Sequence, residues 1–112
     1  MMTMTLFTEK TLWDIIIKTY KEVEKTPQTI LPDTTIISLF GEGKEQFHSY
    51  LENIIRLLHD EYLFVHVTLD LSKQEANELF HTIEEVFLYF YLKIEKIYEI
   101  AEKIRKHIKK ER

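Results

Sequence analysis

A single apolar repeat runs through the last third of the chain and limits what it can fold into. Ten apolar residues follow one another at alternating spacings of four and three, with no glycine or proline between them. They are Ala76, Phe80, Ile83, Phe87, Phe90, Ile94, Ile97, Ala101, Ile104 and Ile108. A mean spacing near 3.5 keeps side chains on one face of an α-helix, as in helices that pack against another helix. The repeat predicts one continuous helix from about residue 73 to about residue 110.

The length of this predicted helix places part of it outside a compact body. About 38 residues at ~1.5 Å each span roughly 57 Å, whereas a compact domain of this size has a radius of gyration near ~13 Å. Burying an isoleucine side chain is worth ~1.5–3 kcal/mol, so we expect Ile97, Ile104 and Ile108 to be covered. We expect a second copy of the chain to cover them, giving a homodimer; an earlier helix of the same chain and a different protein partner are the alternatives. The predicted self-association seam is Phe87, Phe90, Ile94, Ile97, Ala101, Ile104 and Ile108.

Two further helices are predicted upstream. Apolar residues recur at helical spacing over residues 8–25, where Thr26-Pro27 ends the pattern, and again over residues 44–61. Ser72 and Glu75 have the spacing of a capping box and mark the start of the long helix.

Residues 63–71 instead alternate apolar and polar side chains with a period of two, which predicts a half-buried strand. A strand needs a hydrogen-bonding partner, and residues 34–40, rich in β-branched side chains, are our preferred one. The same strand in a second copy is an alternative partner. Residues 34–40 also fit a short helix capped by Asp33 and closed by Gly41.

The expected fold class is therefore α+β and mainly helical: two helices, one or two short strands, and a long C-terminal heptad-patterned helix. We expect a single domain over residues 1–112, with residues 93–112 as a projecting basic helical tail.

Charge and composition limit the partners. Residues 1–92 carry 7 Lys/Arg against 15 Asp/Glu, a net charge of −8, while residues 93–112 carry 8 against 4, a net charge of +4. An acidic body repels nucleic acid and favours basic protein partners. The absence of cysteine excludes disulfides, thiolate zinc sites and cysteine nucleophiles. No apolar run is long enough to span a bilayer, so we expect a cytoplasmic protein without a membrane partner.

One repeated motif suggests a metal site. Glu45 and His48, and again Glu78 and His81, have the Glu-x-x-His spacing of di-iron helical bundles. The intervening phenylalanines occupy the apolar faces, which puts the Glu and His side chains on polar flanks. We therefore expect no metal and no cofactor, and keep these four residues as weak candidates only.

The basic end of the chain suggests phosphate contacts. The candidate nucleic-acid contacts are Lys103, Arg105, Lys106, Lys109 and Lys110. In addition, residues 65–71 followed by the capped helix resemble the strand-then-helix opening of ribbon-helix-helix regulators. That family then turns into a second short helix, whereas the pattern here continues. A nucleic-acid-binding regulator is therefore an alternative function.

The sequence has no nucleophile elbow, no HExxH motif and no dinucleotide-binding loop, so we do not expect an enzyme. Small size and an acidic body favour a non-catalytic protein-binding module, such as a small inhibitor, antitoxin or immunity-type protein acting as a homodimer. Charge complementarity would steer such a protein to a basic partner. A structural assembly subunit is a further alternative.

Overall fold

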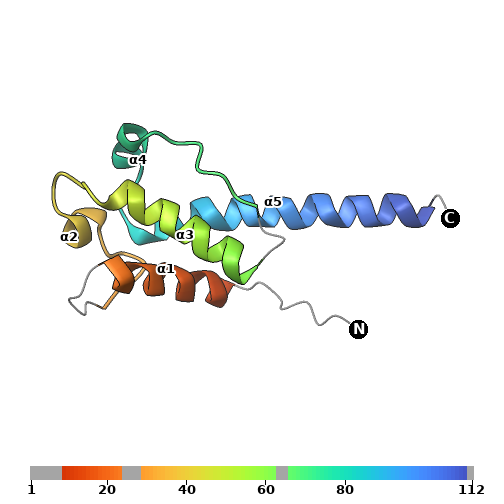
Figure 1. Ribbon diagram of the computed structural model, residues 1–112, viewed down its shortest axis with the longest axis horizontal. Helices are drawn as coiled ribbons and strands as arrows, with labels where there is room; N and C mark the ends of the chain where they lie inside the picture. The colour runs from red at the N-terminus through yellow and green to blue at the C-terminus, as the bar shows by residue number, and fades with distance from the viewer. Residues whose placement is uncertain (1–8, 24–28, 63–65, 111–112) are drawn as a thin grey trace.

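The computed structural model describes residues 9–23, 29–62 and 66–110, and in these ranges the protein consists of five α-helices and loops. The helices are α1 (Glu9–Val23), α2 (Ile36–Phe40), α3 (Phe47–Glu61), α4 (Lys73–Leu79) and α5 (Ile83–Lys110). Figure 1 shows α1 and α3 beside the first half of α5, with α2 and α4 near its N-terminal end. The second half of α5 projects from this body. The molecule is consequently elongated, 56 × 28 × 21 Å, with a radius of gyration of 16.0 Å.

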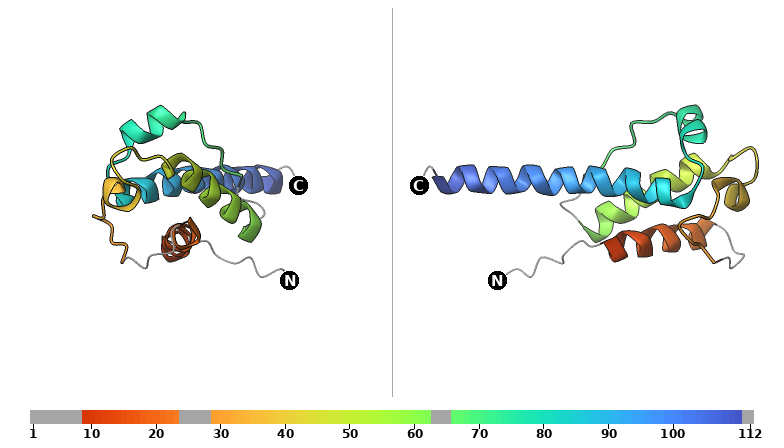
Figure 2. Two further views of the ribbon diagram at one scale, coloured as in Figure 1. Left: turned by 60° about the vertical axis from the view of Figure 1, so that its left-hand side comes forward. Right: turned by 180° about the vertical axis from the view of Figure 1, so that it is seen from behind.

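The hydrophobic core lies where α1, α3 and the first half of α5 meet (Figure 2). Leu12 and Ile16 of α1, Ile54 and Leu58 of α3 and Phe90 of α5 are all fully buried. These side chains recur at the three- and four-residue spacings that predicted the helices, because only that spacing returns a side chain to the same helix face. The prediction of a mainly helical chain with a long C-terminal helix is confirmed.

The predicted strand over residues 63–71 is wrong for the part that the structure describes. Residues 63–65 lie outside the described ranges, and residues 66–72 form an irregular segment without a strand partner. The alternation itself is real: Val67 is buried and Leu69 half-buried, while Thr68 and Asp70 are exposed. Apolar side chains that recur with a period of two indicate an extended backbone with one buried side. Here that side packs on helices, so no sheet is needed to cover it.

The preferred strand at residues 34–40 is also wrong, because this segment forms the short helix α2. Thr35, and not Asp33, is the N-cap: its hydroxyl accepts a hydrogen bond from the Ser38 amide. Gly41 closes the helix, as the alternative prediction required, with a φ of +84° and its N–H donating to the Ile37 carbonyl. The β-branched residues lie at the cap and in the first turn, where tertiary contacts outweigh their preference for strands.

The predicted continuous helix over residues 73–110 is wrong at residues 80–82, where the chain breaks into α4 and α5. Phe80 adopts extended backbone angles, φ −99° and ψ 127°. The Glu85 carboxylate then accepts hydrogen bonds from the His81 and Thr82 amides, at 3.1 and 3.0 Å, and from the Thr82 hydroxyl at 3.2 Å. These bonds satisfy N–H groups that a helix start leaves without an intrahelical partner.

Backbone hydrogen bonds with the start of α2 also stabilise the break. The Ile36 amide donates to the His81 carbonyl at 2.8 Å and the Ile83 amide donates to the Thr34 carbonyl at 2.9 Å. The resulting isolated antiparallel bridge joins Thr35 to Thr82. The α5 helix is left with 28 residues, or about 42 Å at ~1.5 Å per residue, which still carries it well past the body.

Lys44, in the loop before α3, stabilises the C-terminal end of α4. Lys44 has a φ of +48°, outside the helical region, and is buried. Its ammonium group donates to the carbonyls of Asn77, at 2.5 Å, and Phe80, at 2.9 Å. A cation at a helix C-terminus satisfies carbonyls that have no intrahelical donor and complements the helix dipole. The capping box of Ser72 and Glu75 at the other end of α4 is confirmed.

Candidate interaction surface

The apolar side of α5 passes from buried to exposed along the helix. Ile94 is 1% exposed, whereas Ile104 is 54% and Ile108 50% exposed. Ile97 and Ala101 lie between these extremes, and Ile100, 49% exposed, widens the same surface. We call this surface the distal stripe; it consists of Ile97, Ile100, Ala101, Ile104 and Ile108.

The distal stripe continues the face with which α5 contacts its own body. Phe87, Phe90 and Ile94 are buried in the core and belong to the same heptad register. Phe87 stacks on Trp13 of α1 with ring centroids 4.6 Å apart. A further helix lying on the distal stripe would therefore extend in line with α1 and α3.

Polar groups flank the distal stripe. Lys103 lies 3.5 Å from the Glu99 carboxylate and Arg105 lies 3.6 Å from the Glu102 carboxylate, all on exposed side chains. Such surface pairs contribute little to stability, but they reduce the net positive charge offered to a phosphate. Among the other predicted nucleic-acid contacts, Lys106 is exposed, and Lys109 and Lys110 belong to α5 but their side chains lie outside the described set.

A polar cluster that was not predicted from the sequence lies on α5 just before the half of the helix that projects from the body. Asp70, in the irregular segment, accepts a short hydrogen bond from the Tyr89 hydroxyl. The Lys93 ammonium lies 3.2 Å from Asp70 and 5.0 Å from the centre of the Tyr89 ring. Hydrogen bonds from Tyr89 and then Lys93 lower the pKa of Asp70, whereas burial and the nearby Asp70 raise the pKa of Tyr89. The cluster joins residues 66–72 to α5.

Carboxylates surround the point where α5 leaves the body. Figure 1 shows α1 beginning and α3 ending there. These ends carry Glu9, Asp60 and Glu61, which are exposed, and α5 adds exposed Glu95. Desolvation and then the negative charges of Glu9 and Glu95 raise the pKa of Tyr91. We call Glu9, Asp60, Glu61 and Glu95 the acidic collar, in which Glu61 also pairs with Lys18 of α1 at 3.2 Å.

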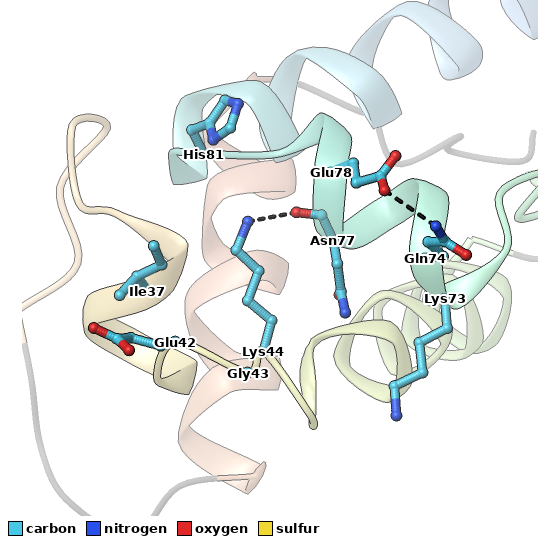
Figure 3. Close-up of a pocket in the computed structure, with 9 residues that line it drawn as sticks. All are labelled: Ile37, Glu42, Gly43, Lys44, Lys73, Gln74, Asn77, Glu78 and His81. Atoms are coloured by element: carbon cyan, nitrogen blue, oxygen red, sulfur yellow. Dashed lines mark hydrogen bonds between the residues drawn. The ribbon is translucent and has the colours of Figure 1, made fainter.

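A pocket of about 650 Å³ lies between α2 and α4. Figure 3 shows Lys44 pointing to the Asn77 carbonyl and Gln74 hydrogen-bonded to Glu78, all four among the residues that line the pocket. Two backbone carbonyls already accept hydrogen bonds from the Lys44 ammonium. The pocket has no nucleophile paired with a base among the side chains that line it.

The predicted metal candidates do not come together in one site. Glu45 precedes α3 and His81 follows α4, so neither Glu-x-x-His pair lies within one helix. Glu78 and His81 line the pocket. His48 instead contacts Glu52, with Nδ1 3.1 Å from the carboxylate, and the Leu71 carbonyl, 3.1 Å from Nε2. Among the described residues, no group of three or more His, Asp or Glu side chains is arranged to hold a metal ion.

Comparison with known proteins adds no family to this description. No family model matches the chain, and neither a curated protein nor a solved structure is significantly similar to it. No helix within the described ranges has the length and apolarity needed to cross a bilayer. In the described part of the chain, the distal stripe and its surroundings are therefore the features that bear on function.

Proposed function

We propose that this chain is a non-catalytic protein-binding module that uses the distal stripe to pack against a helix of another polypeptide. The observation that carries the proposal is the half-exposure of Ile100, Ile104 and Ile108 along one side of a projecting helix. Scattered exposed apolar residues are ordinary, but a contiguous row on one helix face is typical of an interaction surface. A row of i, i+3, i+4 and i+7 anchors is how a helix is recognised by another helix or a groove.

The charge of the body favours an inhibitor-type role, as in small acidic inhibitors, antitoxins and immunity proteins. Residues 1–92 have a net charge of −8, and a protein with that field associates fastest with a basic partner. In this proposal the distal stripe supplies the apolar contact and the body supplies charge complementarity. A role as an assembly subunit would use the same stripe without the need for a basic partner.

The alternative of nucleic-acid binding has weaker support. Lys103 and Arg105 each lie near a glutamate, and the acidic body would repel phosphates at low ionic strength. If phosphates were the ligand, neutralising Lys103 and Lys106 would weaken binding and reduce its salt dependence.

A capture experiment with two matched variants tests the proposed function. Ile104→Glu places a charge in the stripe, whereas Leu92→Glu places one on an equally exposed position of α5 outside it, 61% exposed against 54%. We expect tagged wild-type chain and Leu92→Glu to retain the same polypeptides from the native host, untagged copies of this chain included. Ile104→Glu should retain none of them. Retention by Ile104→Glu of everything that wild type retains would contradict the proposal.

A further inference from the structure

We propose that the occupant of the distal stripe is the distal stripe of a second copy of this chain, lying antiparallel to the first. The inference rests on the proposed function, because it names the partner of the same surface. Four features of the structure support it: the position of the body, the spacing of the stripe, the groove beside Ile97 and the distribution of charge.

The position of the body decides the orientation. Phe87, Phe90 and Ile94 face α1 and α3 on the same side of α5 that carries the distal stripe. In a parallel pair, both bodies would have to occupy the space between the two helices at one level, and they would collide. In an antiparallel pair, each body lies at its own end, and each distal half enters the space beyond the partner's α1 and α3, which Figures 1 and 2 show to be unoccupied by the described helices.

The spacing of the stripe is self-complementary in the antiparallel orientation. A two-fold axis between residues 102 and 103 places Ile97 opposite Ile108 of the other copy and Ala101 opposite Ile104. Such isologous contacts occur twice by symmetry, and the small Ala101 leaves room for the larger Ile104. On the flanks, Arg105 then faces the Tyr98 ring, a favourable cation–π arrangement, and not another cation.

The base of the tail offers a recess for the incoming end. A shallow groove of about 200 Å³ is lined by three apolar side chains, Val67, Ile97 and Ile100, and by four polar ones, His66, Thr68, Lys93 and Lys96. The two-fold arrangement places Ile108 of the second copy over Ile97, at this groove.

Charge favours the same orientation. Residues 93–112 have a net charge of +4, and their C-terminal end would reach the acidic collar of the second copy. A parallel pair would instead place two acidic bodies side by side and two basic ends together. Complementary charges set orientation more than affinity, and their contribution falls as salt screens them. The contact between residues 97–108 is small for a stable interface, so we expect a weak, concentration-dependent dimer.

Cysteine cross-linking can read the orientation directly, because the chain has no cysteine of its own. Tagged Ile97→Cys and untagged Ile108→Cys are mixed at equal concentration and oxidised, and the wild type is sedimented over a concentration series. A disulfide requires Cα atoms about 4.4–6.8 Å apart. Lys106→Cys, on the face away from the stripe, measures random collision. Ile100→Cys with His107→Cys repeats the test at flanking positions if a core variant misfolds.

The results separate this inference from the proposed function. We expect wild-type chain to dimerise with rising concentration, and the mixed 97–108 disulfide to exceed both like pairs and the Lys106→Cys background several-fold. An excess of like pairs, 97 with 97 and 108 with 108, would mean a parallel dimer and overturn the inference. Monomeric sedimentation with cross-linking at background would exclude the second copy. In that case, capture of a different partner through Ile104 would still support the proposed function.

Discussion

Replacing Lys44 by methionine should destabilise the fold far more than a lysine substitution normally does. Methionine keeps an unbranched apolar stem of similar length but removes the ammonium that donates to the carbonyls of Asn77 and Phe80. Hydrogen bonds from a charged donor are each worth about 1.5–3 kcal/mol, and the relief of burying a charge offsets part of that. We therefore expect a net loss of about 2 kcal/mol in the free energy of unfolding. For a chain of this length that corresponds to a fall in Tm of about 8 °C.

Thermal and urea denaturation followed by circular dichroism measure this loss, with Lys18→Met as the control. Lys18 pairs with Glu61 at 3.2 Å, but both side chains are well exposed, 58% and 40%. A surface pair of this kind contributes about 0–1 kcal/mol. The reasoning would be refuted if Lys44→Met lost no more stability than Lys18→Met, since the Lys44 ammonium would then contribute nothing at the end of α4.

Two further predictions concern the carboxylates that hold the junctions. Burial raises the pKa of Glu85, but the amides of Thr82 and His81 and the Thr82 hydroxyl outweigh this and lower it from 4.5. The pKa of Asp70 is likewise lowered from 3.8, chiefly by its hydrogen bond from Tyr89. Because these folded-state pKa values lie below the unfolded ones, the stabilisation is present above about pH 4.5 and is lost as the pH falls through the folded-state values. Denaturation between pH 7 and pH 3 should show this loss, and Glu85→Gln should reduce the slope; an unchanged slope would contradict the assignment. Tyr89→Phe should cost about 1 kcal/mol and speed hydrogen exchange in residues 66–72, and unchanged exchange there would mean that the Asp70 bond does not hold the segment.

Most of the fold could be predicted from helical periodicity, because α1, α3 and α5 each bury one row of apolar side chains whose spacing is visible in the sequence. Two of the three wrong predictions, the strand over residues 63–71 and the unbroken helix over residues 73–110, have one physical origin: a pattern of burial does not specify hydrogen bonding. Val67 and Leu69 alternate as a strand would, yet they cover helices. Phe80 and Ile83 are buried on both sides of the α4–α5 break, so the heptad register runs through it undisturbed.

One feature that was not predicted, the start of α5 after the break, does have a local signal in the sequence. Thr82 and Glu85 have the same capping-box spacing as Ser72 and Glu75, and that spacing marks a helix start inside the heptad run. Lys44 had no such signal, because lysine is normally exposed and its burial follows from the approach of α4. On the projecting half of α5, Ile100, Ile104 and Ile108 are each about half-exposed. That a second copy covers them stays a prediction.

The most direct test of the central claim is hydrogen–deuterium exchange of the amides of residues 97–108 in the pure chain, measured over a range of protein concentrations. An isolated projecting helix opens readily, whereas a helix covered by another is protected. We predict that exchange in these residues slows as concentration rises, while exchange in α3 stays constant, and that Ile104→Glu abolishes the change. Rapid exchange at every concentration, unchanged by the substitution, would contradict the claim that a second copy covers the distal stripe.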